Sequence, residues 1–173
     1  PDMSEEDEAK LLAGKIVIHS DLDSEMVLGF IEIDASPSRV WEEILDLEAR
    51  LAENKPAKAM EVYHDSTEGD WRQIKARWDI VVLGMDITWY NHYRYNASTS
   101  YFWFSLDPDE DSDIVKADGY YHVIPSDLIE GGSRFIYLAD TDSGRKMPEA
   151  IREYLAKHGL KDMLKAIKIR AEQ

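Results

Sequence analysis

Apolar and polar residues alternate along the middle of the chain with a period of two, which is typical of half-buried β-strands. In the stretch 85–95, every second residue lies on one mainly apolar face, formed by Met85, Ile87, Trp89, Asn91 and Tyr93. The same pattern predicts strands at 59–64, 71–83, 85–95, 100–106, 114–124 and 134–140. Short links rich in glycine, asparagine and aspartate join them, which favours an antiparallel meander. Strands of about ten residues curl strongly, so we expect a curved sheet.

The alternation also predicts which side chains point toward the inside of this sheet. The inward positions on the other strands are Ile74, Ala76, Trp78, Ile80, Tyr121, Val123, Phe135 and Tyr137. In the stretch 100–106 the pattern does not show which face points inward, because one face carries Phe102 and Phe104 and the other carries the equally large Tyr101 and Trp103.

Two strands and a helical region are predicted before the meander. The strands lie at 14–20, which is β-branched, and at 26–35, which alternates again. A helix then begins at Ser36, which can cap free amides, and Pro37 fits the first helical position. Its apolar residues recur at helical spacing, at Val40, Trp41, Ile44 and Leu45. A second short helix is expected before Pro56.

The last predicted element is a long amphipathic helix at 148–171. Pro148 marks its first turn. Its apolar stripe consists of Ile151, Leu155, Leu160, Met163, Leu164 and Ile167. Gly159 lies inside this stripe and predicts a bend or a brief interruption of the helix.

Length and composition fit one globular domain. The chain has 173 residues, of which 44% are hydrophobic and 32% charged. We expect residues 1–10 to be an acidic, flexible tail and residues 11–173 to form a single domain. No apolar run reaches the roughly 18 residues that a membrane span requires. The sequence does not assign the protein to one cellular compartment, although the cytoplasm is slightly favoured. A removed leader peptide remains an alternative, because the chain begins at Pro1 without methionine.

The charge and the cysteine count exclude several classes of function. The formal net charge is −15, and an acidic domain repels the phosphate backbone, so we expect no nucleic-acid partner. The absence of cysteine removes disulfides, thiolate metal sites and cysteine nucleophiles. The five histidines are scattered over different elements, and the acidic stretch 107–113 lacks the ligand series of a calcium loop. We therefore expect no metal and no cofactor.

Four stretches resemble the START-like helix-grip superfamily (SRPBCC), which includes START lipid-transfer domains, polyketide cyclases and the birch-pollen-allergen family. They are the first strand at 14–20 (GKIVIHS), the strand-to-helix junction at 31–46 (IEIDASPSRVWEEILD), a last hairpin at 119–125 (GYYHVIP) and 131–137 (GGSRFIY), and the start of the terminal helix at 147–151 (MPEAI). The extra first strand is similar to that of the START subgroup. The resemblance covers nearly the whole chain and implies an α+β fold, in which a curved antiparallel sheet wraps around the long C-terminal helix.

This fold implies a hollow between the concave sheet and the helix, because their side chains need not fill it. The resemblance implies that the partner is a lipid or another hydrophobic small molecule, bound and transferred without catalysis. We expect the ligand to contact Ile74, Trp78, Ile87, Trp89, Asn91, Tyr93, Phe104, Tyr121, Val123, Phe135, Tyr137, Ile151, Leu155 and Met163. An aromatase/cyclase acting on a polyketide is the alternative, and it would need an acid or base inside the pocket. A partner-binding module with a solid interior is a third possibility.

A stripe of lysines on the terminal helix can be interpreted in two ways. Lys157, Lys161, Lys165 and Lys168 recur every three or four residues. We interpret them as the solvent face of the helix. The alternative is a transient contact with a membrane surface or an acidic partner. The oligomeric state is unknown at this stage.

Overall fold

The computed structural model describes residues 3–20, 26–144 and 147–173, apart from the side chains of residues 20 and 156–158. Its helices are α1 (Glu5–Leu12), α2 (Pro37–Leu45), α3 (Leu47–Glu53) and α4 (Glu149–Ala171). Its strands are β1 (Val17–Ser20), β2 (Met26–Ile33), β3 (Ala57–Glu68), β4 (Trp71–Val82), β5 (Met85–Asn96), β6 (Tyr101–Leu106), β7 (Lys116–Pro125) and β8 (Ser133–Asp142).

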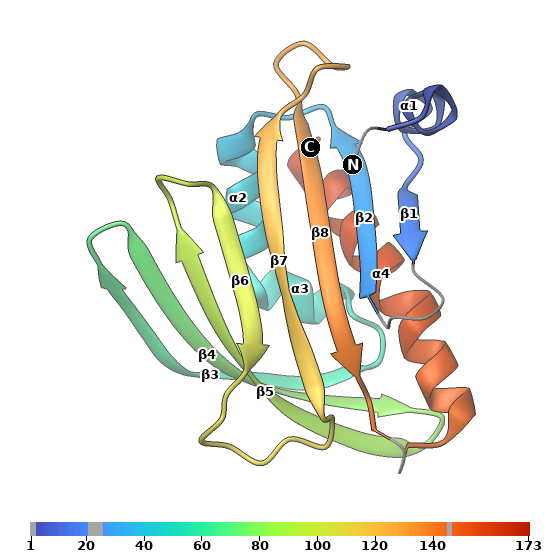
Figure 1. Ribbon diagram of the computed structural model, residues 1–173. Helices are drawn as coiled ribbons and strands as arrows, with labels where there is room; N and C mark the ends of the chain where they lie inside the picture. Colours follow the sequence, from blue (N-terminus) through green and yellow to red (C-terminus); the bar gives the residue numbers. More distant parts are fainter. Residues whose placement is uncertain (1–2, 21–25, 145–146) are drawn as a thin grey trace.

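The described strands form one eight-stranded sheet in the order β1-β2-β8-β7-β6-β5-β4-β3, and every neighbouring pair is antiparallel. Figure 1 shows that this sheet is strongly curved and that α2, α3 and α4 lie on the same side of it. The predicted α+β architecture, with a curved antiparallel sheet around a long terminal helix, is confirmed.

Helix α2 begins as its sequence predicts, and its neighbour α3 begins by the same means. Ser36 caps α2, because its side-chain oxygen accepts a hydrogen bond from the Arg39 amide (3.4 Å), and Pro37 occupies the first turn. Asp46 caps α3 by accepting from the Ala49 amide (2.9 Å). The two short helices therefore meet at a single residue, which fixes the direction in which α3 leaves α2.

Three boundaries differ from the expectation. Helix α1 begins at Glu5, capped by Ser4, so part of the segment expected to be a tail is helical. Strand β3 continues to Glu68, although its outer half is exposed on both faces and shows no alternation. Helix α4 runs through Gly159 without a break, so the predicted interruption is wrong. In each case hydrogen bonds along a helix or to a neighbouring strand extend the element beyond what side-chain pattern alone indicates.

The main core lies between the concave face of the sheet and the helices. The sheet contributes Ile31, Phe102 and Phe135, all fully buried, and α4 contributes Leu164 and Ile167. Burial also confirms the inward faces predicted on β4 and β7, and it shows that Phe102 and Phe104 are the inward residues of β6. Met85 is a correction: it is 38% exposed, because it lies at the β4–β5 hairpin tip beyond the cover of the core.

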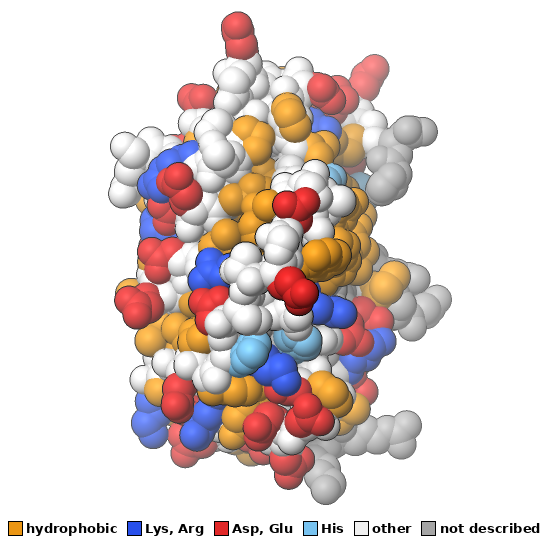
Figure 2. Space-filling model, turned by 90° about the vertical axis from the view of Figure 1, so that its left-hand side faces the viewer, with side chains coloured by type: hydrophobic (Ala, Val, Ile, Leu, Met, Phe, Trp, Pro, Cys, Tyr) orange, Lys and Arg blue, Asp and Glu red, His pale blue; other side chains and the backbone are white. Residues whose placement is uncertain are grey.

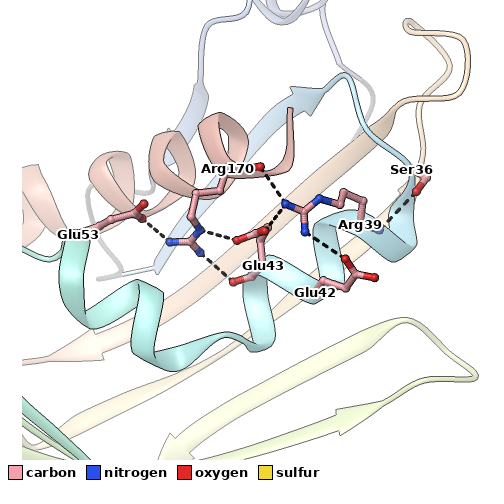
Figure 3. Close-up of polar contacts among 6 residues, drawn as sticks. All are labelled: Ser36, Arg39, Glu42, Glu43, Glu53 and Arg170. Atoms are coloured by element: carbon pink, nitrogen blue, oxygen red, sulfur yellow. Dashed lines mark hydrogen bonds and ion pairs between the residues drawn. The ribbon is translucent and has the colours of Figure 1, made fainter. Parts of the chain in front are cut away.

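A network of ion pairs fixes the C-terminal end of α4 against α2 and α3 (Figure 3). Arg170 of α4 pairs with Glu43 of α2 and with Glu53 of α3, and it also donates to the Glu43 carbonyl oxygen (2.9 Å). Arg39 pairs with the same Glu43 (2.5 Å) and donates to the Arg170 carbonyl oxygen (3.2 Å). Because the Arg170 and Glu43 side chains are largely buried, this network holds the helix end in one position.

Strand β7 approaches its neighbours so closely at Gly119 that no side chain fits. A Cβ atom there would lie 2.1 Å from the Leu138 carbonyl oxygen and 2.5 Å from Cζ of Phe104. Gly119 pairs with Phe104 of β6 in the sheet register. The glycine therefore makes room for the Phe104 ring on the concave face.

We expect the substitution Gly119→Ala to lower the free energy of unfolding by about 3 kcal/mol, because backbone and ring must both move to admit the methyl group. The matched control is Gly159→Ala, where a Cβ meets no atom within 4 Å and alanine favours the helix. The control should leave stability unchanged or raise it by up to about 1 kcal/mol. Urea denaturation followed by tryptophan fluorescence measures both, and equal stability of the two variants would contradict the close packing at Gly119.

Candidate functional site

A cavity of about 680 Å³ lies between the concave face of the sheet and the helices α3 and α4. Its interior is lined by side chains from β4 to β8, and its other wall comes from α3 and the middle and N-terminal half of α4. The exposed residues Glu53, Lys55, Glu149, Arg152 and Asp162 are also in contact with it and form a polar rim. The cavity thus has an apolar interior and a charged mouth.

Strands β4 and β5 supply one wall through the alternation of their side chains. Trp78 pairs with Trp89 across the two strands, and their rings stack at 6.4 Å between centroids. Ile80 pairs with Ile87 in the same register two residues along each strand. All four side chains contact the cavity, so one face of a two-stranded ribbon forms a continuous apolar surface.

An aromatic cluster from three successive strands forms the second wall. Phe104 of β6, Tyr121 of β7 and Tyr137 of β8 contact one another, with ring centroids 5.1 to 6.0 Å apart. The rings are stacked or tilted, which is a favourable geometry for aromatic pairs. This wall offers flat aromatic surface to whatever occupies the cavity.

The polar groups inside the cavity meet at Tyr93. Its hydroxyl oxygen accepts hydrogen bonds from the indole N–H of Trp78 (2.9 Å) and from the side-chain amide of Asn91 (2.7 Å). Burial raises the pKa of Tyr93, and burial likewise raises the pKa of Tyr137. Both phenols are therefore neutral at physiological pH.

A positive charge also reaches the cavity, from Arg50 on α3. Its guanidinium carbon lies 6.0 Å from the centroid of the Tyr93 ring and 5.7 Å from that of Tyr121. The Nη2 atom donates to the Tyr121 hydroxyl (3.2 Å) and approaches the Met163 sulfur (3.7 Å). The Nη1 atom is buried and has no hydrogen-bond partner. The guanidinium is thus close to aromatic rings, and it remains charged because the pKa of an arginine side chain lies far above physiological pH.

The structure brings most of the predicted site residues together around this cavity. The predicted residues that line it are Trp78, Ile87, Trp89, Asn91, Tyr93, Phe104, Tyr121, Tyr137, Leu155 and Met163. Their contact with a ligand stays a prediction.

The other predicted site residues lie away from the cavity. Val123 and Phe135 pair with each other in the sheet and belong to the solid core. Ile151 packs with Met147 and the β4–β5 hairpin. Ile74 belongs to the core as well and also borders a second hollow, described below. These positions point inward as expected, but helices or neighbouring strands fill the space in front of them.

Sequence reasoning missed Arg50, although a signal was present. In a helix, residues three apart lie on the same face, so Arg50 shares a face with the buried Leu47. A cation on the apolar side of a short helix is unusual, because burying a charge is costly unless a partner is present. The helix was too short for its apolar face to be assigned from periodicity alone.

A second hollow, of about 740 Å³, lies between α3 and the strands β3 and β4. Exposed acidic residues line much of it, among them Asp46, Glu48 and Glu61, and Arg72 there is already paired with Asp65 (2.8 Å). On the side of the molecule where β3 lies, Figure 2 shows hydrophobic side chains interspersed with charged ones. This hollow is more open and mixes apolar side chains with acidic ones, whereas the cavity under α4 has a mainly aromatic and aliphatic lining, so the cavity under α4 is the better candidate site.

The described residues contain neither a cluster of metal ligands nor a membrane-spanning helix. There, no group of three or more histidine, aspartate or glutamate side chains lies close enough to hold a metal ion. No helix within the described ranges is long and apolar enough to cross a membrane.

Comparison with known proteins places this geometry among solved structures. No protein-family model and no curated protein sequence matches the chain. A STAR-related lipid transfer protein from Xanthomonas axonopodis matches with a TM-score of 0.70 at 15% identity, over 92% of this chain and 93% of that one. A START superfamily protein from Mycobacterium smegmatis matches with a TM-score of 0.66 at 19% identity, over 86% and 97%. The Zhui aromatase/cyclase from a Streptomyces species matches with a TM-score of 0.65 at 15% identity, over 85% and 93%.

Identities this low establish the fold rather than the activity. The neighbours share the curved antiparallel sheet and the long terminal helix over nearly their whole length. The chain therefore has the START-like helix-grip fold, which it shares with a STAR-related lipid transfer protein and with an aromatase/cyclase.

Proposed function

We propose that this protein binds a lipid or another hydrophobic small molecule in the cavity under α4 and carries it without changing it chemically. The observation behind this proposal is the cavity of about 680 Å³ with an aromatic and aliphatic interior. Small-molecule sites typically measure about 300 to 1,000 Å³ and are mainly apolar with a few polar groups. The cavity has the size and the chemistry of such a site.

The energetics of packing support an occupant. Protein interiors are packed nearly as densely as organic crystals, and unfilled apolar space costs stability. Water is a poor filler for most of this cavity, because each buried water needs two or more polar partners and the wall around Trp78, Ile80 and Ile87 offers almost none. A hydrophobic guest removes its own apolar surface from water and restores contacts to the aromatic wall.

The groups inside the cavity favour binding over catalysis. A cyclase would need a general acid or base within hydrogen-bond reach of its substrate. Among the described lining residues, the carboxylates Glu53, Glu149, Glu153 and Asp162 are all exposed at the rim, and none of the lining residues is a histidine. Away from this rim, the ionisable groups of the described lining are phenols, Arg50 and Lys116, and Lys116 is paired with Asp140. The aromatase/cyclase remains the alternative because one structural neighbour has that activity in its name.

The lysine stripe on α4 does not contribute to the proposal. The side chain of Lys157 lies outside the described part of the structure. Lys161 and Lys165 are exposed, but Lys168 pairs with Glu172 and donates to the Glu32 carbonyl oxygen (2.8 Å). Lys168 therefore fastens the helix to β2 instead of facing a membrane. Transient membrane contact stays an expectation that belongs to the transfer step, where a carrier exchanges its ligand.

We expect a hydrophobic compound to co-purify with the protein at close to one molecule per chain, because the cavity holds one drug-sized guest. Organic extraction of the denatured protein, followed by mass spectrometry, measures this. The control is the variant Ala166→Phe, in which a ring fills the cavity from α4, purified in parallel. The proposal would be contradicted if the native protein yielded no more hydrophobic compound per chain than the variant.

A neutral fluorescent probe tests the location of binding. We expect Ala166→Phe to weaken the binding of 1-pyrenebutanol by roughly tenfold or more, because the new ring occupies the space of the guest. The matched control is Ala150→Phe, which makes the same change at an exposed position of α4 outside the cavity. Fluorescence titration gives both dissociation constants, and equal weakening or no weakening in both variants would place the binding elsewhere.

A further inference from the structure

The cavity contains two buried polar atoms that lack a partner. In the part of the chain that the structure describes, the buried side-chain nitrogen and oxygen atoms without a hydrogen bond are Nη1 of Arg50 and Oδ1 of Asn91. Both residues line the cavity under α4. Buried polar groups are almost always hydrogen-bonded in native proteins, so each unpaired one calls for an explanation. Here both unpaired atoms belong to the same site.

The charge of Arg50 is not balanced by any carboxylate of the described residues. No described carboxylate forms an ion pair with it, and Glu53, one helical turn away on α3, pairs with Arg170 instead. Tyr93 cannot serve as a counterion, because burial raises its pKa and keeps the phenol neutral. The rings of Tyr93 and Tyr121 offer a cation–π contact, which only partly replaces the lost hydration of a guanidinium.

Other arginines of this protein show that the chain normally pairs such a charge. Arg134 is largely buried and pairs with the fully buried Glu32. Arg170, also largely buried, has two carboxylate partners. The half-exposed Arg72 is held by two hydrogen bonds from its guanidinium to Asp65 (3.0 and 2.8 Å). Arg50 is the exception among these, and it is the one whose free nitrogen lines the ligand cavity.

We propose that the ligand of this cavity is an amphipathic anion, whose carboxylate or phosphate group binds Nη1 of Arg50 and whose apolar body lies against the aromatic wall. This inference rests on the proposed function and specifies its ligand class. An oxyanion is the natural partner of a guanidinium, because it accepts charge-assisted hydrogen bonds. A carbonyl or hydroxyl group would satisfy the nitrogen but leave the charge unbalanced.

The second unpaired atom indicates a hydroxyl or amide on the same ligand, or a bridging water. Oδ1 of Asn91 is an acceptor, and the amide nitrogen of the same side chain is already bonded to the Tyr93 hydroxyl (2.7 Å). The Tyr93 ring in turn lies beside the guanidinium of Arg50. An anion bound to Arg50 and a donor group bound to Asn91 would therefore both lie close to Tyr93, which limits how a ligand can be oriented.

A matched pair of probes tests the charge. The carboxylate 1-pyrenebutyrate and the neutral alcohol 1-pyrenebutanol carry the same aromatic body, and fluorescence titration gives both affinities. For the native protein we expect the carboxylate to bind more tightly. In Arg50→Met, which keeps the length but removes the charge, we expect its affinity to fall roughly 10- to 100-fold while that of the alcohol changes little. Arg50→Lys, which retains the charge, should restore part of the loss.

The stability of the ligand-free protein provides a second readout. If Arg50 binds a ligand, its unpaired charge destabilises the ligand-free protein. Arg50→Met should then leave the melting temperature unchanged or raise it. If Arg50 is structural, the same variant should melt at a lower temperature and bind both probes more weakly. The latter result would overturn the inference. Arg50→Gln, which keeps a donor without a charge, repeats the test if the methionine variant fails to fold.

Competition separates the two kinds of anion. Dodecanoate, dodecyl phosphate and dodecanol each compete with 1-pyrenebutyrate for the native protein. Stronger displacement by either anion than by the alcohol supports the inference and identifies the head group. Equal displacement by all three shows that charge is not recognised, which overturns the inference while the cavity function stands. If neither pyrene probe bound, the result would instead contradict the proposed function itself.

Discussion

A straight helix cannot fill the concavity of a strongly curved sheet, and the rest of this structure depends on that mismatch. At its C-terminal end, α4 closes the gap with buried side chains, Leu164 and Ile167, and with the ion pairs of Arg170. At its N-terminal end Ile151 packs against the β4–β5 hairpin, and the cavity lies under the helix between these two contacts, next to Leu155 and Met163. One helix therefore packs against the sheet at both ends and covers the hollow between them.

The aromatic lining follows from the same curvature. On a concave face, inward side chains converge, so large rings contact one another across neighbouring strands, as Phe104, Tyr121 and Tyr137 do. Gly119 shows how tight this convergence is, because the missing side chain on β7 leaves room for the Phe104 ring. The wall is thus a packed and preformed surface, which lowers the conformational cost of binding a flat guest.

The sequence predicted the alternation of the strands, the capped start of α2 and the inward face of β4 because each is a local property of a few residues. It could not assign β6, where both faces are aromatic, until tertiary contacts buried Phe102 and Phe104. It also could not separate cavity from core: Phe135 and Tyr137 share a face of β8, yet the core encloses the first and the second faces the hollow. That distinction depends on where the helices lie, which is a property of the whole fold.

Arg50 was the hardest residue to foresee, and its position gives the site a link to the rest of the protein. It lies one turn before Glu53 on α3, and Glu53 holds Arg170 at the end of α4. An anion bound to Arg50 would therefore contact the same short helix that anchors the covering helix. The proposed ligand contact at Arg50 and the anchor of α4 at Glu53 thus lie one helical turn apart on α3.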